Sequence, residues 1–455
     1  MRQSDWLSFL RQSFIILRIA YANEMRKIVR LLTPRVPGAS RLVAASPVYY
    51  GWIVWLVALI GAICSSPGQS FSVSLFMDFF IEDFGLDRTT VSSLYGAGTF
   101  VASLGLTWVG RRIDSLGNRY VGVAVGVLFF IVLMLSSLIN GPIMLFFAFA
   151  GMRGLGQGAL TLVSSTAVAN WFRQRRGRMM SLLALVFALF QGAYVNLLRL
   201  LLESLDWRQV FIVMGVGVAA LVIPSFALLM RNRPEQYGLL PDNAASPPAE
   251  IKDQPVDIEE NWTLAEAIRT PILWVFIAAR ILPSAWGTGL ILHQVSIFGL
   301  LDHSAQVTTE TFALISLFAA ASALLAGYLI DRVKPSYVAA LQMLALLSAC
   351  ALAMVMRDSW LLIMYALAFG LGMGIGYVFD GAVWPNLFGR RFQGEIRGFV
   401  YTASVIGSAL GPAIFGLSFD LSGDYEPVLW LGAGLCLIVL VAALLTPPPR
   451  RKNES

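Results

Sequence analysis

Three charged residues stand out inside the long apolar segments of the chain. They are Arg153, Arg280 and Asp380, and each is flanked by runs of apolar and small residues. A charge at the centre of a membrane-spanning helix costs about 2.5 to 3.5 kcal/mol on insertion scales, so each is a candidate functional residue. A guanidinium binds anions, and a buried carboxylate can take up a proton. The chemistry predicted is recognition of an anion together with movement of a proton.

Arg280 and Asp380 are expected at the same depth. Arg280 follows Pro271, where a span begins, by about 13 Å of helix. Asp380 precedes Phe388, where another span ends at the same face, by about 12 Å. Two interpretations stay open. The two side chains neutralise each other permanently, or an anionic substrate competes for Arg280 while Asp380 takes up a proton, because a buried carboxylate without its cation favours the neutral form.

Arg153 is a second candidate for binding the anion. It follows Pro142 by about 16 Å of helix, and Gln157 shares its face at the i+4 position. The glycines of "GMRGLGQG" permit close approach of neighbouring helices. We therefore expect Arg153 and Gln157 to contribute to substrate binding.

Four further residues are weaker candidates. Tyr377 and Trp384 flank Asp380 at i−3 and i+4, so they either line a wall of the binding site or pack against a neighbouring span. Gln69 follows a Pro-Gly pair, where a break in the first span would free backbone groups toward a cavity. His293 either titrates near neutral pH and helps to couple protons, or is a hydrogen-bonded packing residue.

The elements that must position these residues are membrane-spanning helices. Of the 455 residues, 57% are hydrophobic and only 13% are charged, which is outside the range of a soluble domain. A span takes roughly 20 apolar helical residues. The chain is predicted to be an all-α integral membrane protein with twelve spans, at 49–79, 89–110, 119–139, 142–170, 178–203, 208–230, 271–299, 306–330, 335–356, 360–388, 396–421 and 426–446.

Basic residues indicate the orientation, because Lys and Arg near span ends stay on the cytoplasmic side. They gather in the turns after spans two, four, eight and ten: Arg111, Arg112, Arg119, Arg173, Arg175, Arg176, Arg178, Arg332, Lys334, Arg390, Arg391 and Arg397. Both termini are therefore predicted to be cytoplasmic, in a multi-pass protein of the plasma membrane, the inner membrane of a bacterium. Residues 1–46 hold eight Lys or Arg and two acids, which favours anionic membrane lipid over nucleic acid as the partner.

The two halves of the chain look like copies of one unit. Asp114 and Asp331 follow spans two and eight 217 positions apart, and Phe172 and Phe388 end spans four and ten 216 positions apart. A shared offset indicates a duplicated six-span unit. The predicted organisation is a basic segment 1–46, a six-helix bundle 47–230, a polar linker 231–270 with a short amphipathic helix, a six-helix bundle 271–446 and a cytoplasmic tail 447–455.

Short motifs resemble a known family. Through Gly110, Asp114, Gly117 and Arg119, "GRRIDSLGNR" resembles the loop signature of the major facilitator superfamily between its second and third spans. The piece "GYLIDR", with Asp331, resembles a degraded second copy. The pieces "YYGWIV", "SPGQSFSVSLFMD", "WPNLFGRRFQGEIRG" and "LGPAIFGLSFDLSGDY" are similar to the monocarboxylate and oxalate/formate branch, especially its bacterial members.

The resemblance implies the major facilitator fold, with two pseudo-symmetric six-helix bundles and with spans one, four, seven and ten around the cavity. It also implies a cytoplasmic latch, in which Asp114 pairs with a basic residue and meets a helix end when the inward mouth is closed. Arg119 and Arg178 are candidate partners in this gate, as are Arg111 and Arg112, and Asp331 is its counterpart in the second half.

One departure bears on the substrate. Well-known carboxylate carriers of this branch use a lysine in span one or eleven, or an arginine in span eight. This chain has no lysine in any predicted span and no arginine in 306–330. Arg153 or Arg280 would have to supply those contacts.

We therefore predict a secondary active transporter that moves a small organic anion, best matched by a monocarboxylate, with a proton by alternating access. It is expected to work as a monomer, without cofactor or metal. One alternative is proton-coupled efflux of amphipathic compounds, which a large apolar cavity and a locked Arg280–Asp380 pair would favour. Another is a non-transporting receptor or scaffold with the same fold. An enzyme is not expected, because the chain has no phosphate-binding glycine motif and no nucleophile and base arrangement.

Overall fold

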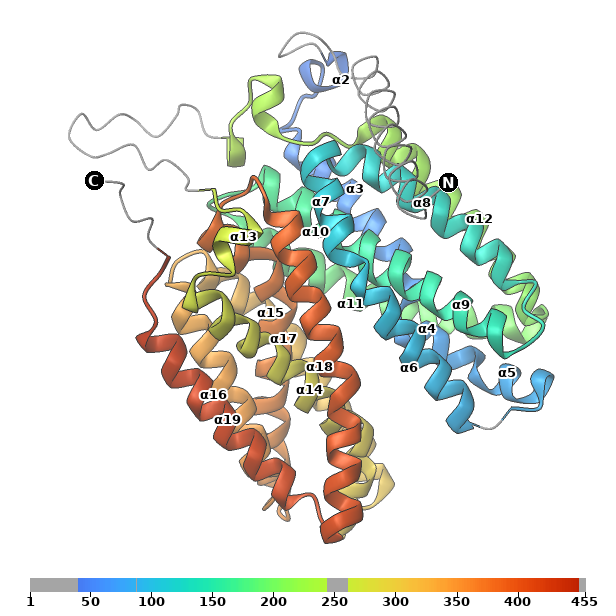
Figure 1. Cartoon of the computed structure of the whole chain (residues 1–455), viewed down its shortest axis with the longest axis vertical. Coiled ribbons are helices and arrows are strands. Elements are labelled where there is room, and N and C mark those ends of the chain that lie inside the picture. The colour runs from blue at the N-terminus through green and yellow to red at the C-terminus, as the bar shows by residue number, and fades with distance from the viewer. Residues whose placement is uncertain (1–39, 87, 244–260, 450–455) are drawn as a thin grey trace, which may run out of the picture.

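The computed structural model describes residues 40–86, 88–243 and 261–449, and throughout these ranges the chain is helical with short turns and no strand (Figure 1). The expectations for residues 1–39, 244–260 and 450–455 fall outside the described residues. The N-terminal half contains α2 (Arg41–Ala44), α3 (Gly51–Cys64), a 3₁₀ turn (Ser66–Gly68), α4 (Ser70–Val73), a 3₁₀ turn (Ser74–Phe76), α5 (Met77–Phe84), α6 (Arg88–Leu104), α7 (Leu106–Leu116), α8 (Asn118–Ser136), α9 (Pro142–Met152), a π-helix (Arg153–Leu160), α10 (Thr161–Trp171), α11 (Arg176–Ser204), α12 (Trp207–Pro224) and a π-helix (Ser225–Leu229). The linker and the C-terminal half contain two 3₁₀ turns (Pro234–Tyr237 and Pro241–Asn243), α13 (Leu264–Ala267), α14 (Pro271–Leu300), α15 (Ala305–Ile330), α16 (Pro335–Ala353), α17 (Ser359–Phe388), α18 (Gln393–Ser422) and α19 (Glu426–Leu445).

The predicted spans are present as helices. Within the described residues, eleven helices are long and apolar enough to cross a membrane. The remaining span, predicted at 89–110, is built from α6 and α7, which an interruption at Gly105 divides into helices of 17 and 11 residues. Neither piece is long enough alone, and together they supply the twelfth crossing. The prediction of an all-α membrane protein is confirmed.

The two halves form two bundles that lie side by side (Figure 1). In the N-terminal bundle α8 packs against α9 and α12, and in the C-terminal bundle α16 packs against α17 and α19. Helices α8 and α16 begin 217 positions apart and also end 217 positions apart. This is the offset that Asp114 and Asp331 show, so the bundles are built on one repeated plan.

The first span is broken after α3. The 3₁₀ turn at Ser66–Gly68 follows, and Gln69 has an extended backbone, with φ −83° and ψ 153°, before α4 begins. Pro67 removes a donor from the helical hydrogen-bond ladder, which favours the break. A Cβ on Gly68 would lie 2.9 Å from the Cα of Gly156, so the break packs directly on the π-helix of the fourth span. The Pro-Gly pair had predicted this interruption.

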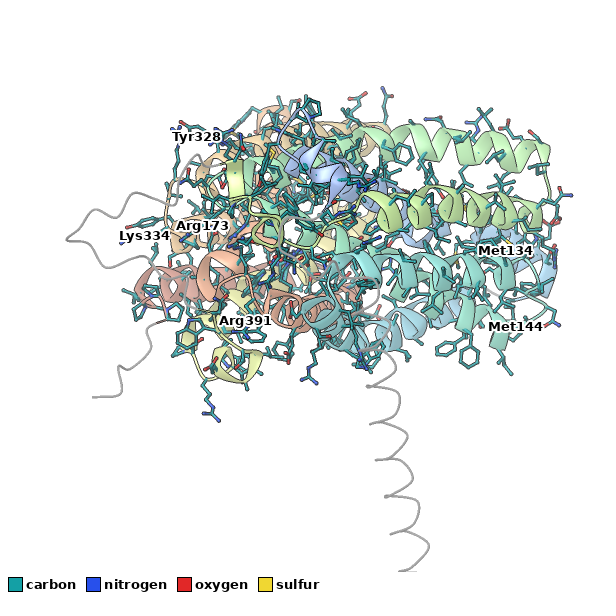
Figure 2. All side chains as sticks on the ribbon, turned by 90° about the horizontal axis from the view of Figure 1, so that it is seen from above. Met134, Met144, Arg173, Tyr328, Lys334 and Arg391 are labelled. Carbon is teal, nitrogen blue, oxygen red and sulfur yellow. The ribbon has the colours of Figure 1, made fainter. Side chains whose placement is uncertain are left out.

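One end of the molecule carries the linker and the turns after α7, α10, α15 and α17, and is called the linker end below (top of Figure 1). Figure 2 looks onto this end and shows Arg173, Lys334 and Arg391 gathered on it, away from Met134 and Met144. Helix α13 begins with a capping box, in which Thr263 and Glu266 accept hydrogen bonds from each other's backbone N–H groups. Thr263 and Glu266, whose spacing predicted the linker helix, therefore cap its first turn.

Asp114 fastens the bundles together at the linker end. Its carboxylate accepts hydrogen bonds from the N–H groups of Gly394 and Glu395, at the start of α18, both at 2.9 Å. A carboxylate at a helix N-terminus satisfies free donors and meets the positive end of the helix dipole. The approach needs glycines, because a Cβ on Gly110 would collide with the carbonyl oxygen of Gly394. Beside it, Arg111 forms an ion pair with Glu395 at 2.8 Å.

Asp331 makes the same contact in the opposite direction. It accepts hydrogen bonds from the N–H groups of Gly177 at 2.6 Å and Arg178 at 3.1 Å, at the start of α11. A Cβ on Gly327 would lie 2.6 Å from the carbonyl oxygen of Gly177, so this approach needs glycine too. The pKa of Asp331 is raised above its ordinary value, because the effect of burial outweighs the lowering by the two N–H groups and Arg178. We call the two contacts the Asp114 clasp and the Asp331 clasp.

The arginines expected as partners of Asp114 have other contacts. Arg178 forms an ion pair with Asp331 at 3.4 Å, and the Nε of Arg119 donates to the carbonyl oxygen of Ala227 at 2.9 Å. Arg112 lies over the Trp108 ring, 4.9 Å from its centroid. Asp114 does meet a helix end, as the resemblance implied. The helix N–H groups rather than these arginines hold it, because the close glycine contact brings rigid donors within reach.

Adding a side chain at Gly327 is expected to loosen the Asp114 clasp, although Gly327 belongs to the other clasp. A valine there would collide with the backbone of Gly177 and hold the bundles apart at the linker end. We expect the yield of a disulfide between Arg111→Cys and Glu395→Cys, which replace an ion pair, to fall several-fold in Gly327→Val.

The matched control is Gly217→Val in α12, because nothing lies within 4 Å of the position of a Cβ on Gly217. The control should keep the cross-linking yield. An equal yield in Gly327→Val would show that the two clasps close independently.

Candidate functional site

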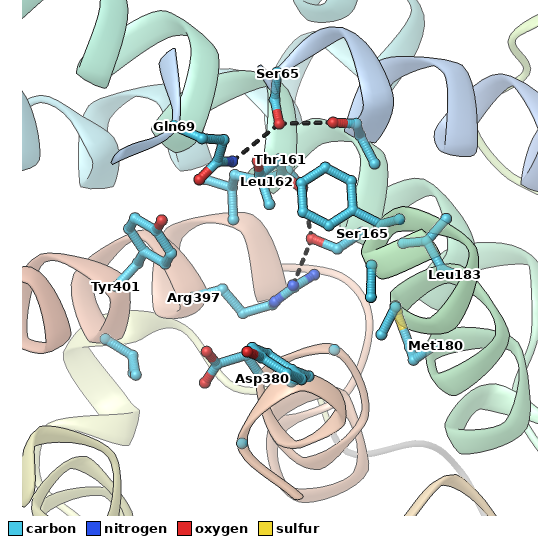
Figure 3. A pocket seen from close by; sticks show the side chains of 18 of the residues that line it. Ser65, Gln69, Thr161, Leu162, Ser165, Met180, Leu183, Asp380, Arg397 and Tyr401 are labelled. Carbon is cyan, nitrogen blue, oxygen red and sulfur yellow. Dashed lines mark hydrogen bonds between the residues drawn. The ribbon is translucent and has the colours of Figure 1, made fainter. Parts of the chain in front are cut away.

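A central cavity of about 260 Å³ lies between the two bundles (Figure 3). Its walls come from α3 and the break in the first span, from α10 and α11, and from α14, α17 and α18. Helices of spans one, four, seven and ten therefore contribute, as the resemblance implied, together with spans five and eleven. Two arginines and one aspartate lie in the lining, namely Arg280, Arg397 and Asp380.

Arg280 and Asp380 form an ion pair inside this cavity. The Nε of Arg280 lies 2.7 Å from the Oδ2 of Asp380, and the two side chains are only 19% and 24% exposed. Equal depth along α14 and α17 predicted that these side chains could meet. The second oxygen, Oδ1 of Asp380, is buried and has no hydrogen-bond partner among the described residues. The pair leaves one carboxylate oxygen free to accept a proton or a donor.

Arg397 is a cavity residue that the sequence analysis assigned only to membrane orientation. It is 6% exposed, and its guanidinium crosses to the other bundle, where Ser165 and Thr166 of α10 accept at 2.6 Å and 3.2 Å. Figure 3 shows Arg397 reaching toward Ser165, with Asp380 on its other side. Its position, four residues into α18 and before Gly398, was the available signal. The predicted span began at 396, which placed Arg397 at its very start, and Arg397 was grouped with the basic residues of the preceding turn.

The charges in the cavity do not cancel. Two guanidinium groups face one carboxylate, and the lining has no other Lys, Arg, Asp, Glu or His among the described residues. The net charge of the lining is therefore positive by one. This arrangement favours an anion over a neutral or cationic ligand, because the paired side chains are mostly buried and their charges are only partly screened.

The rest of the lining is largely apolar. Met180, Leu183 and Phe187 of α11 face the cavity, and Trp384 borders it while lying 1% exposed against neighbouring rings. Tyr377 also lines the cavity, with 55% of the residue exposed. Of the two expected wall residues, Tyr377 offers an accessible surface, and Trp384 is mainly a packing residue.

Arg153 lies away from the central cavity. It is 9% exposed and donates to the carbonyl oxygen of Gly68 and the hydroxyl of Ser70, both at 3.2 Å, and to the hydroxyl of Thr99 at 3.1 Å. The Tyr95 ring lies beneath its guanidinium, with the centroid 5.1 Å away. In this conformation Arg153 donates to a backbone carbonyl oxygen, that of Gly68, at the break in the first span, where the helical hydrogen-bond pattern is interrupted.

The remaining candidates divide between the cavity and the bundle interiors. Gln69 lines the cavity and donates to Ser65 at 3.0 Å. Gln157 does not line it, and its backbone oxygen accepts from Tyr401 at 3.4 Å. The two ring nitrogens of His293 lie 3.0 Å from the Tyr425 hydroxyl and 3.2 Å from the carbonyl oxygen of Pro412. His293 is a hydrogen-bonded residue within the C-terminal bundle.

Among the described residues, no three His, Cys, Asp or Glu residues group closely enough to hold a metal ion. The four gate candidates lie at the linker end, where Asp114, Asp331 and Arg178 take part in the clasps and Arg119 contacts the end of span six. The geometry is that of a positively charged cavity between two bundles that the clasps join at the linker end.

Comparisons with known proteins agree with the fold. The model of the Major Facilitator Superfamily matches residues 58–376 and 284–455. The chain is 24% identical over 369 residues to the "Uncharacterized MFS-type transporter YhjX" of Escherichia coli (strain K12), covering 80% of this chain and 88% of that protein. It is 26% identical over 205 residues to "Monocarboxylate transporter 9" of Mus musculus, covering 45% of this chain and 39% of that protein.

Among solved structures, the human organic anion transporter MFSD10 (TETRAN) has a similar fold, with a TM-score of 0.62 and 17% identity over 86% of this chain and 99% of that one. The family model covers well over half of the sequence, and the two bundles have the expected architecture. The chain belongs to the Major Facilitator Superfamily.

Proposed function

We propose that this transporter moves a small organic anion, best matched by a monocarboxylate, together with a proton. The family and the fold already indicate a membrane transporter of small molecules rather than an enzyme. The observation that carries the finer proposal is the Arg280–Asp380 ion pair in a cavity whose net charge is positive by one.

The proposed coupling follows from the cost of an unpaired charge on a side chain that is mostly buried. An incoming carboxylate competes with Asp380 for Arg280, because both are anions that match the guanidinium fork. Asp380 then lacks its cation and takes up a proton, since burial disfavours an isolated carboxylate. Anion and proton would cross as a neutral pair. Arg397 adds the second positive charge that favours entry of the anion.

A relative supports the anion class. One relative is named a monocarboxylate transporter, and its match covers 45% of this chain. In this conformation Arg280 and Arg397 face the cavity, whereas Arg153 is bound within the N-terminal bundle. We therefore assign anion recognition first to Arg280, with Arg397 beside it, and we assign to Arg153 the support of the broken first span.

A second candidate function has its own observation. Much of the lining is apolar, and Arg280 is paired with Asp380, which are the features that favour efflux of amphipathic compounds by proton exchange. In that case the ion pair would stay closed during binding, and Met180, Leu183 and Phe187 would hold the ligand. The competing predictions differ in whether Arg280 is required for uptake of a short carboxylate.

Replacing Arg280 by alanine is expected to reduce carboxylate uptake at least about ten-fold, because it removes the anion's partner in the cavity. The measurement is uptake of labelled short carboxylates into proteoliposomes, with and without an inward proton gradient. Wild-type uptake should rise with the gradient.

Arg199→Ala is the matched control, since Arg199 is exposed and its ion pair among the described residues is with Glu203, one turn along α11. Its uptake should equal that of the wild type. Carboxylate uptake that survives in Arg280→Ala would contradict the proposed anion site. If folded wild-type protein takes up no carboxylate, efflux of amphipathic compounds becomes the favoured function.

We further propose that the linker end is cytoplasmic, because the basic turns gather there. The structure would then be the state closed toward the cytoplasm. In intact cells a membrane-impermeant thiol reagent should label Asp358→Cys, at the opposite end, and should label Ser115→Cys only after permeabilisation. The reverse pattern would invert the assignment.

A further inference from the structure

A second cavity of about 200 Å³ lies within the C-terminal bundle, among α14, α16 and α17. It shares Arg280, Gly376 and Tyr377 with the central cavity, so the two spaces meet at the guanidinium of Arg280. We call this space the side pocket. A ligand held by Arg280 in the central cavity would therefore have the side pocket as its neighbour.

The side pocket has one unsatisfied polar atom. Gln342 is fully buried in α16, and its Nε2 donates to the carbonyl oxygen of Gly372 at 3.4 Å. Its Oε1 has no hydrogen-bond partner among the described residues. A buried carbonyl without a donor is costly, so this atom is expected to meet a donor in the working protein.

Two of the three hydroxyl groups that line the side pocket already have partners, and the third belongs to Tyr377. Ser284 donates to the backbone carbonyl of Ser404 at 2.7 Å, and Thr288 donates to the backbone carbonyl of Ser284 at 2.6 Å. The Thr288 hydroxyl also lies 2.9 Å from the hydroxyl of Ser408. Among the side chains that line this pocket in the described residues, the Oε1 of Gln342 is the buried acceptor without a partner.

The fold itself does not demand a polar residue at this position. Helices α8 and α16 are related by the 217-residue offset, and the counterpart of Gln342 is Val125, which is 4% exposed. The N-terminal bundle thus packs the same place with an apolar side chain. An amide that packing does not require, beside the cavity arginine, indicates a role toward a ligand.

A buried amide without a hydrogen-bond partner is not in itself evidence of a ligand site. Gln294 is also buried in the C-terminal bundle, and both of its amide atoms lack a partner among the described residues. However, Gln294 lines neither the central cavity nor the side pocket. Gln342 differs because it borders a space that meets Arg280.

We propose that the side pocket is a subsite for a hydroxyl group of the substrate. The substrate would be a small hydroxy monocarboxylate, with its carboxylate on Arg280 and its hydroxyl donating to the Oε1 of Gln342. A neutral donor fits better than an ammonium, because Arg280 lies beside the pocket and repels a second cation. This inference rests on the proposed function, since it takes Arg280 as the carboxylate partner.

The test compares uptake of butanoate with uptake of its 2-, 3- and 4-hydroxy derivatives into proteoliposomes under one proton gradient. For the wild type, at least one hydroxy acid should be preferred over butanoate by about ten-fold or more, because a site built for a hydroxyl rejects the analogue that lacks it. In Gln342→Met the preference should fall below about two-fold, since the thioether is a weak acceptor. The matched control, Gln294→Met, should keep the wild-type ratio.

Each outcome decides the proposal. Equal uptake of butanoate and its derivatives by the wild type, or a preference that persists in Gln342→Met, overturns the subsite and leaves anion transport through Arg280 intact. Failure of the wild type to take up any carboxylate overturns the proposed function and the subsite with it. If Gln342→Met does not fold, Gly376→Ala replaces it, because the new Cβ would lie 3.0 Å from the Nε2 of Gln342 and 3.8 Å from the Nη1 of Arg280. It should lower the preference, and an unchanged ratio overturns the subsite.

Discussion

A charge inside the hydrocarbon needs a partner, and the ion pair of Arg280 and Asp380 meets this constraint at the centre of the molecule. The pair joins α14 to α17 and lies in the wall of the cavity between the bundles. Each side chain is stabilised in its charged form by the opposite charge of the other. When Arg280 is withdrawn from Asp380, the carboxylate therefore favours its protonated form. This dependence would link anion binding to proton uptake through the side chains of Arg280 and Asp380 alone.

The linker end is symmetric, whereas the cavity is not. The glycines and carboxylates of the Asp114 and Asp331 clasps recur at an offset of 217 residues, so the same kind of contact joins the two bundles twice. The charged residues of the cavity come from the C-terminal half alone, as does Gln342 of the side pocket. The clasps are therefore shared by both halves, whereas the charged residues of the cavity belong to one half.

Much of this structure could be predicted from the sequence. Helix depth alone placed Arg280 level with Asp380, and the Pro-Gly pair placed the break before Gln69, because both depend on local geometry. Positions set by long-range packing could not be read in this way. Arg153 stands at mid-membrane depth yet binds the backbone at Gly68, and Arg397 counts as a turn residue until α10 is brought beside it. Residue spacing along a helix predicts how deep a side chain lies in the membrane. The contacts of that side chain depend on which helix packs beside it.

The central claim is that an anion displaces Asp380 from Arg280 and that Asp380 then takes up a proton. The most direct measurement is calorimetric titration of the purified protein with the transported anion, in buffers of different ionisation enthalpy near neutral pH. The account predicts uptake of about one proton for each anion bound by the wild type, and none in Asp380→Asn. Asp420→Asn, an exposed residue of α18, should behave as the wild type. Anion binding to the wild type without proton uptake would contradict the claim.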